Sequence, residues 1–369
     1  MAGIAFFLFA FLCLLVFAHY AVFASLSFLF GLSGFWQRAG VWILSALVPA
    51  NFLFASFLIH SVENAVSRLW YVISAFSLGL VSNLFFLVLL GWGFVFGFRL
   101  IGAQPKLTAI GMAILAIGVS VSVYGVVNAF RPTVRSVEVT IPGLPDGWKG
   151  KTVVQISDVH LGPVYREEFL SGVVEKINAL HPALVCIAGD LFDGTDGDLD
   201  ALARPLRDIR SEHGTFFVSG NHETYLGLDR SLSALSGTGV RILDDQAVIV
   251  DGVAVIGIGY PERGAKKDIP TLAASLAKEH PGLPSILLYH APSDIDRMRE
   301  TGVGLQLSGH THRGQQVPFN LVTHLVHKGY DYGLYEFGKY ALSVSSGVGT
   351  WGPPLRIGTQ SEIVAITLR

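Results

Sequence analysis

The sequence predicts an α/β protein in which mixed sheets follow an N-terminal bundle of four transmembrane helices. Three observations support this fold class. The 369-residue chain divides into an apolar part and a charged part, the apolar part holds four stretches of membrane-spanning length, and strands alternate with helices in the charged part. The chain is long enough for two domains or so, and each can bury a core of its own.

Charge marks the division between the two parts. The chain has 26 Lys and Arg and 28 Asp and Glu, yet only five of these residues precede Arg131. Charged residues make up 15% of the chain, which is low for a soluble protein. We therefore predict a membrane anchor over residues 1–130, a linker and domain start over 131–150, and a globular domain over 151–369.

The anchor is predicted to contain four helices. A bilayer core requires about 20 apolar residues in helical conformation, and residues 4–30, 41–59, 69–98 and 107–130 meet this requirement. A cleaved signal peptide is the alternative for the first stretch, but that stretch lacks a basic beginning and further spans follow it. Polar residues such as Asn51 and Asn83 are expected to contact other helices, because no charged residue lies in mid-span to mark a transport path.

The orientation of the anchor follows from its flanking charges. Four helices place both termini on one side, together with Arg68, Arg131, Arg135 and Lys149. Positive-inside counting then favours a cytoplasmic C-terminal domain. The two cysteines suggest no disulfide framework, and a net charge of -2 suggests no nucleic-acid partner. The bilayer is the partner that the sequence predicts.

The C-terminal part reads as strands and helices in alternation, followed by a strand-rich half. Helices are expected at residues 165–180 and 199–211. Strands are expected at residues 152–156, 183–188, 215–218, 247–250, 253–258, 285–289, 304–307, 340–344 and 363–368.

Candidate metal ligands follow five of these strands. Open α/β sheets bind ligands beyond the carboxyl ends of their strands, and seven carboxylate, amide and imidazole side chains stand there: Asp158, His160, Asp190, Asn221, His290, His310 and His312. Residues two apart in extended backbone point the same way, as in Asp158-x-His160. Without thiolates, the set suits Mn²⁺, Fe or Zn²⁺, and its size indicates more than one ion.

Glycine precedes three of these ligand positions. Gly189, Gly220 and Gly309 are expected to let the backbone turn sharply after each strand, because glycine adopts conformations that other residues avoid.

The motifs Asp-x-His, Gly-Asp, Gly-Asn-His-Glu, a lone His after a strand, and Gly-His-x-His occur here in this order. In these motifs the chain resembles the calcineurin-like metallophosphoesterase superfamily over residues 151–369. Ser308-Gly-His-Thr-His, Gly333-Leu-Tyr and Ser346-Gly-Val-Gly further resemble its membrane-associated bacterial branch. The resemblance implies a sandwich of two mixed sheets flanked by helices, with two divalent or trivalent metal ions.

The resemblance also implies a role for each matching residue. Asp158, His160 and His312 would hold the first metal, and Asn221, His290 and His310 the second. Asp190 would bridge them by giving one oxygen to each ion. His222 would donate a proton to the leaving group, and Asp193 would orient and charge-stabilise His222.

The expected activity is hydrolysis of a phosphate ester or pyrophosphate by a hydroxide that two metals activate, at the bacterial cell membrane. A lipid-linked substrate and a soluble phosphoester both stay open. Arg313 stands where similar proteins commonly have glycine, and it is either exposed or directed at an anionic group of the substrate. The alternatives are a catalytically inactive membrane sensor or scaffold that retains the fold, and a transporter.

Overall fold

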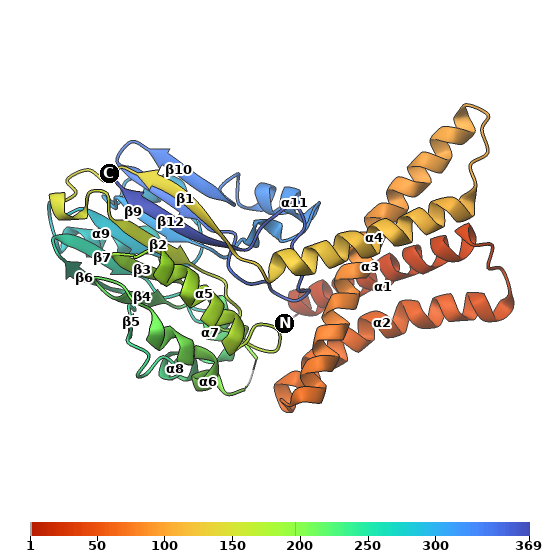
Figure 1. Cartoon of the computed structure of the whole chain (residues 1–369), viewed down its shortest axis with the longest axis horizontal. Coiled ribbons are helices and arrows are strands. Elements are labelled where there is room, and N and C mark those ends of the chain that lie inside the picture. Colours follow the sequence, from red (N-terminus) through yellow and green to blue (C-terminus); the bar gives the residue numbers. More distant parts are fainter. Residues whose placement is uncertain (1, 196) are drawn as a thin grey trace. The chain divides into compact units, whose positions relative to one another are not determined.

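The computed structural model describes residues 2–195 and 197–369, and it divides the chain into two compact units (Figure 1). One unit runs to Val127 and also includes Gly352–Leu355. The other consists of Asn128–Trp351 and Arg356–Arg369. The division lies three residues before the predicted end of the anchor, so the last two residues of the fourth long helix belong to the globular unit.

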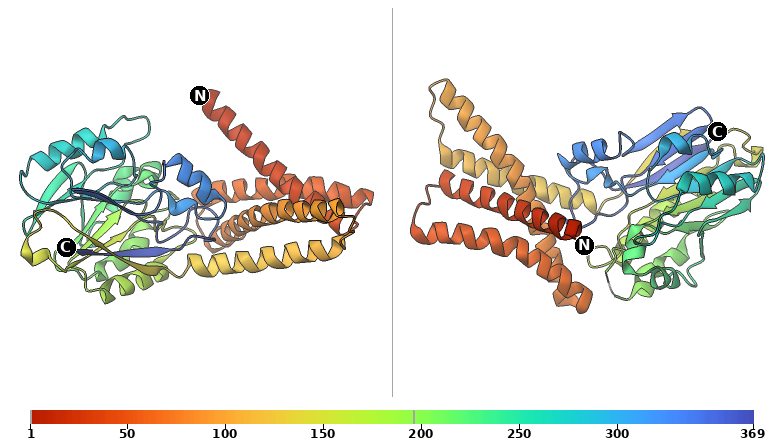
Figure 2. Two further views of the ribbon diagram at one scale, coloured as in Figure 1. Left: turned by 90° about the horizontal axis from the view of Figure 1, so that it is seen from above. Right: turned by 180° about the vertical axis from the view of Figure 1, so that it is seen from behind.

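Four long helices form the N-terminal unit, as predicted (Figure 2). They are α1 (Ala2–Leu29), α2 (Phe35–Ser61), α3 (Ala65–Leu100) and α4 (Leu107–Ala129). In the described part of the chain, these four are long and apolar enough to cross a membrane. Polar side chains join them, since Asn51 donates a hydrogen bond to Ser74 at 2.6 Å and Asn83 donates one to Ser122 at 2.9 Å.

Two six-stranded mixed sheets form the centre of the globular unit, which confirms the predicted fold class. The first sheet has the order β1 (Thr133–Val139), β12 (Glu362–Leu368), β2 (Thr152–Ile156), β3 (Leu184–Ala188), β4 (Thr215–Val218) and β5 (Val240–Ile242). The second has the order β10 (Gly333–Phe337), β11 (Tyr340–Val344), β9 (Leu305–Ser308), β8 (Ser285–Leu288), β7 (Val253–Gly257) and β6 (Gln246–Val250).

Strand β1 occupies part of the stretch that the sequence predicts as a linker. It pairs in parallel with β12, with Thr133 opposite Glu362 and Val139 opposite Leu368. Three residues therefore separate the end of α4 from the first sheet. The long connections hold the helices α5 (Glu167–Ala179), α6 (Leu199–Ala203), α7 (Asn221–Leu226), α8 (Leu228–Ser233), α9 (Ile269–Lys278), α10 (Ile295–Met298) and α11 (Phe319–Val326), and the 3₁₀ turns η1 (Asp146–Trp148), η2 (Arg204–Asp208) and η3 (His312–Gly314).

Alternate residues of the strands face different cores. In β2, Val153 belongs to the core between the two sheets, whereas Val154 belongs to the core under α5. In β8, Ile286 faces the first sheet, and Leu287 packs with residues of α9 and α10. Because both faces are covered, these strands consist mostly of buried apolar residues, as buried parallel strands are expected to do.

Strands β2, β3 and β4 run parallel in one sheet, and β7, β8 and β9 run parallel in the other. The carboxyl ends of parallel strands lie at one edge of their sheet. Polar residues that follow β2, β3 and β4 are therefore neighbours, as are those that follow β8 and β9.

Candidate metal centre

The structure brings six of the seven predicted ligands into two groups. In each group, one ligand atom from each side chain lies within 4.8 Å of the others. The first group is Asp158, His160 and His312, and the second is Asp190, His290 and His310. All six residues follow the strands that the sequence assigns to them.

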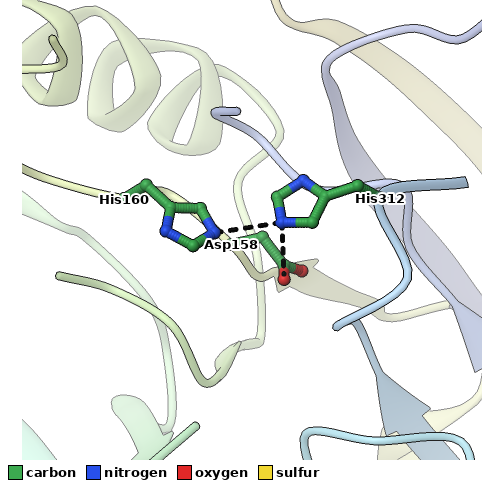
Figure 3. A group of neighbouring side chains, drawn as sticks. All are labelled: Asp158, His160 and His312. Atoms are coloured by element: carbon green, nitrogen blue, oxygen red, sulfur yellow. Dashed lines mark hydrogen bonds and ion pairs between the residues drawn. The ribbon is translucent and has the colours of Figure 1, made fainter. Parts of the chain in front are cut away.

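The first group joins the end of β2 to the end of β9 (Figure 3). His160 Nε2 lies 3.0 Å from His312 Nε2, and His312 Nε2 lies 3.4 Å from Asp158 Oδ1. Two ring nitrogens and a carboxylate oxygen thus point at a common position. The Asp158 carboxylate is fixed there, because its two oxygens accept the backbone N–H of His310 at 3.0 and 3.1 Å.

The second group joins β3 to β8 and β9. His290 Nε2 lies 3.0 Å from Asp190 Oδ2 and 3.3 Å from His310 Nδ1. His290 Nδ1 donates to the carbonyl of Ala188 at 2.8 Å. Since a carbonyl only accepts, this bond places one hydrogen on Nδ1, so Nε2 is the nitrogen that would bind a ligand after it releases its own proton.

Asp190 lies between the two groups, and one of its oxygens faces both. Oδ2 is 3.0 Å from His290 Nε2 and 4.0 Å from His160 Nε2. Oδ1 instead accepts the backbone N–H of His222 at 2.9 Å. Oδ2 thus stands between the two groups, and the expectation that Asp190 gives one oxygen to each ion stays a prediction.

Asn221, the seventh predicted ligand, begins α7 beside Asp190. Its Oδ1 is buried, and no hydrogen-bond donor reaches it from residues 2–195 or 197–369. A buried amide oxygen without a donor is costly, by about 1–3 kcal/mol. A cation would satisfy it, so this residue fits the predicted metal ligand set.

The backbone at the site is strained. Five of the seven predicted ligands have positive φ: Asp158 (51°), His160 (53°), Asp190 (51°), His310 (72°) and His312 (48°). Left-handed backbone costs L-residues roughly 1–2 kcal/mol each, although Asp and His tolerate it better than most. The turns after β2, β3 and β9 are therefore held by their surroundings, and the ligands are positioned before any ion binds.

The three glycines of the site differ in their roles. Gly189 has φ of +86°, as expected for a sharp turn. Gly220 and Gly309 do not have positive φ, so these turns do not use the left-handed conformation of glycine. A Cβ on Gly220 would lie 2.1 Å from Asp190 Oδ1, and one on Gly309 would lie 2.2 Å from Asp158 Oδ2. These two glycines leave room for the carboxylates.

Burial makes most of the imidazoles neutral. It lowers the pKa of His160 and of His312, and together with the charge of His290 it lowers the pKa of His310 to about 3. For His290, burial acts in the same direction, but Asp190 outweighs it and raises the pKa to about 10. Neutral imidazoles bind metal ions directly, whereas His290 must first release a proton.

His222 lies against the first group, with its ring centroid 4.6 Å from that of His160. Its Nδ1 donates to the backbone carbonyl of Asp193 at 2.8 Å. The Asp193 carboxylate does not make this bond, and its Oδ1 instead lies 3.2 Å from His160 Nδ1. One carboxylate oxygen of Asp193 lies within 4.8 Å of a ring nitrogen of both His160 and His222, so the side chain is close to both histidines. The predicted orientation of His222 by Asp193 stays a prediction.

Known proteins were compared with the chain. The family model of the calcineurin-like phosphoesterases matches residues 151–314, a stretch that contains all seven predicted ligands. An uncharacterized metallophosphoesterase of Campylobacter jejuni is 35% identical over 85% of this chain and 86% of its own. The chain belongs to the calcineurin-like metallophosphoesterase family.

The chain is also similar to two proteins of Danio rerio. A transmembrane protein with metallophosphoesterase domain from Danio rerio is 30% identical over 90% of this chain and 80% of its own, so the likeness includes much of the apolar part. Among solved structures, a dimetal phosphatase from Danio rerio is 14% identical over 54% of this chain and 88% of that one, with a TM-score of 0.35. Together with the four apolar helices, the first of these indicates a membrane-anchored metallophosphoesterase.

Glu223 is a residue of this metallophosphoesterase site for which no role was predicted. Its buried carboxylate accepts three backbone N–H groups, from Asp190 at 3.0 Å, Phe192 at 3.0 Å and Gly220 at 2.6 Å. Burial, followed by the charge of Asp190, raises the pKa of Glu223 to about 7. Glu223 joins the loop of Asp190 to the loop of Asn221. A Glu three residues after a helix N-cap is a capping-box signal that predicts part of this contact.

Arg356 was also missed, because a single Arg in Pro-Pro-Leu-Arg-Ile carries no motif. It is fully buried, and its guanidinium donates to the carbonyls of Ser346, Gly347 and Gly349. The loop that these bonds hold donates in turn to the first ligand turn, from the Gly349 N–H to the Asp158 carbonyl at 2.8 Å. Arg356 therefore supports the turn that carries Asp158.

Arg313 follows His312 and is partly buried. Its guanidinium carbon lies 4.3 Å from the centre of the Tyr332 ring. Both side chains line a cavity of about 390 Å³ together with Leu321, His324 and Tyr335. Arg313 is therefore not simply an exposed surface residue, which was one of the two alternatives predicted from the sequence. The other alternative, a contact with an anionic group of the substrate, stays a prediction.

Proposed function

We propose that this metallophosphoesterase hydrolyses a phosphate monoester, phosphate diester or pyrophosphate at a membrane surface. One observation carries the proposal: two groups of three ligands converge, with Asp190 Oδ2 between them. Nitrogen and oxygen ligands of this kind suit Mn, Fe or Zn ions. No serine or cysteine nucleophile is required for such chemistry.

In this proposal, Asp158, His160 and His312 hold one ion, and Asn221, His290 and His310 hold the other. When bound, the pair of ions supplies an activated water and neutralises phosphoryl charge. Asp190 fixes the spacing between the two ligand groups. The left-handed turns keep the ligands in place, so that little reorganisation accompanies binding.

His222 is proposed to hold the proton that the leaving group requires. Its Nδ1–H is committed to the Asp193 carbonyl, so the proton for the leaving group is a second one, carried on Nε2 of the imidazolium form, whose pKa burial lowers. A positioned acid of this kind contributes about 10²- to 10⁴-fold in rate. Replacing His222 by Ala is therefore expected to reduce turnover by that factor while the metal content stays unchanged.

The proposal includes a location and a substrate class. We propose a bacterial cell membrane with the catalytic domain on the cytoplasmic side, on the basis of the flanking positive charges. A phosphoester linked to a lipid is the favoured substrate, because the anchor keeps the site close to lipid. The bilayer and this substrate are the proposed partners.

The test uses the full-length protein in detergent with an aryl phosphate ester and with added Mn²⁺ or Zn²⁺. Asp190→Ala is expected to abolish hydrolysis and to lower the metal content measured by elemental analysis. The control is Asp296→Ala, because that side chain is 93% exposed on a surface helix. Full activity of Asp190→Ala, or of the wild-type protein after removal of metal by a chelator, would contradict the proposed mechanism.

A further inference from the structure

Helix α11 presents an apolar face that the described protein does not cover. None of its eight residues is buried. The exposed fractions are 63% for Leu321, 57% for Val322, 78% for Leu325 and 68% for Val326. These positions are related by three and four residues, so they lie on one side of the helix. We call these four residues the apolar face of α11.

The opposite side of α11 is fixed next to the candidate metal centre. His324 Nδ1 lies 2.8 Å from Asp331 Oδ1, and Asp331 accepts a hydrogen bond from Thr311 at its carbonyl, at 2.6 Å. Thr311 stands between the predicted ligands His310 and His312. The ring of His327, directly after the helix, lies 6.0 Å from that of His310. The helix is thus anchored by its polar side, and its apolar side is left open.

A short path of hydrogen bonds connects α11 to the end of α4. Asn128, in the last turn of α4, donates to the carbonyls of Arg356 at 3.0 Å and Thr359 at 2.7 Å. Thr359 donates to the Gln315 carbonyl at 2.9 Å, and the Val317 N–H donates to the Ile357 carbonyl at 2.9 Å. All of these residues belong to the globular unit. Residues 356–359 therefore bond both to Asn128, near the end of α4, and to the segment that leads into α11.

We propose that the apolar face of α11 inserts into the interfacial region of the bilayer that the four long helices span. Amphipathic helices of this kind bury their apolar side about 5–10 Å into the boundary between headgroups and acyl chains. A bilayer is the occupant because α4 ends beside the segment that leads into this helix. Val317 adds a further exposed apolar side chain, 46% accessible, two residues before the helix begins.

The substrate class follows from this location and rests on the proposed function. A helix that lies in the interface on one side and touches the ligand loop on the other brings acyl chains close to the metal centre. The inferred substrate is an amphiphile whose phosphoester group reaches the metal centre while its apolar chains stay in the bilayer. A soluble phosphoester would gain nothing from the apolar face of α11.

The location is tested by fluorescence in proteoliposomes, independently of activity. Full-length protein with Cys13→Ser has Cys186 as its remaining thiol, which is fully buried. An environment-sensitive dye is attached to Leu325→Cys, and as a control to Ile249→Cys on β6, where Ile249 is 46% exposed. The expected result is a blue-shifted emission at position 325 that a nitroxide near the carbonyl end of the acyl chains quenches more strongly than one near the methyl end.

Two results of this experiment would overturn the proposal. One is equal quenching at positions 325 and 249. The other is a blue shift at position 325 without quenching by lipid nitroxides, since a second copy of the chain or another protein would then cover the helix. Either result leaves the proposed hydrolysis untouched, because the readout contains no substrate.

The substrate class is tested with Leu325→Ser/Val326→Ser, a double variant of exposed residues outside the metal centre. Hydrolysis of a soluble aryl phosphate ester is expected to stay at the wild-type rate. Hydrolysis of a phosphatidic acid probe in vesicles is expected to fall at least several-fold, mainly through a higher apparent KM. If the double variant hydrolyses both substrates at the wild-type rate, the inferred role of α11 is contradicted. If the wild-type protein hydrolyses neither substrate, the proposed function is contradicted instead.

Discussion

The imidazole of His222 donates to the main-chain carbonyl of Asp193 at 2.8 Å, and the Asp193 carboxylate lies 3.2 Å from the ring of a different histidine, His160. One residue therefore serves the candidate proton donor and a candidate metal ligand through different atoms. A side-chain substitution keeps the main-chain bond to His222, and it removes both the carboxylate beside His160 and the negative charge that raises the pKa of His222.

Replacing Asp193 by Asn is accordingly expected to weaken metal binding. Loss of a carboxylate behind a ligating histidine typically lowers metal affinity 10- to 100-fold. The measurement is the metal concentration that restores half of the activity of stripped protein. If Asp193→Asn lowers turnover at saturating metal and leaves this concentration unchanged, the carboxylate acts through His222 after all.

Replacing Asn221 by Leu is expected to remove one ion per chain, as measured by elemental analysis. The same change should not lower the thermal unfolding temperature in the presence of a chelator, because the buried Oδ1 has no donor to lose among the described residues. In the presence of metal, only the wild-type protein should gain stability. A drop in stability without metal would show that the amide oxygen has a partner in the protein.

Replacing Gly220 by Ala is expected to abolish activity, since the added Cβ would lie 2.1 Å from Asp190 Oδ1. The matched control is Gly172→Ala in α5, where a Cβ meets nothing within 4 Å. That change should stabilise the protein by about 0.5–1 kcal/mol, because alanine is the better helix former. Similar activity in the two variants would mean that the Asp190 loop adapts to the methyl group.

Replacing Glu223 by Gln is expected to destabilise the protein by about 1–3 kcal/mol, because a buried carboxylate with three N–H donors is exchanged for a group that brings donors of its own. Thermal unfolding of the metal-free protein is the measurement. Glu262→Gln, at an exposed loop residue, is the control. An unchanged unfolding temperature would contradict the assignment of Glu223 as the link between two ligand loops.

The sequence predicted those parts of the molecule that depend on local pattern. Apolar length located the four long helices, and uninterrupted apolar runs located strands such as β3 and β8, whose far ends carry Asp190 and His290. Strand β1 was not predicted, since its exposed and half-buried residues lack an apolar run and pairing with β12 defines it. Arg356 was missed for a related reason, because its partners are main-chain carbonyls that no sequence motif encodes.

Packing explains two features that the local sequence pattern did not predict. Gly220 and Gly309 occur where a turn was expected, yet the space beside each glycine is what matters, and that space is defined by a carboxylate from another strand. Helix α11 was not predicted at all, although its Leu and Val pairs recur at helical spacing. Eight residues that contribute nothing to the core give too short a pattern to separate from a loop.

The left-handed turns restrict how the ligand set of this centre can change. At Asp158, His160, Asp190, His310 and His312, a substitute must tolerate positive φ, which Asn and Asp do more readily than branched or bulky residues. Exchange among Asp, Asn and His is thus open to mutation, whereas a thiolate at any of these positions would bear the full conformational penalty. Conversion of the site to a centre for soft metals is therefore opposed by the main chain before ligand chemistry is considered.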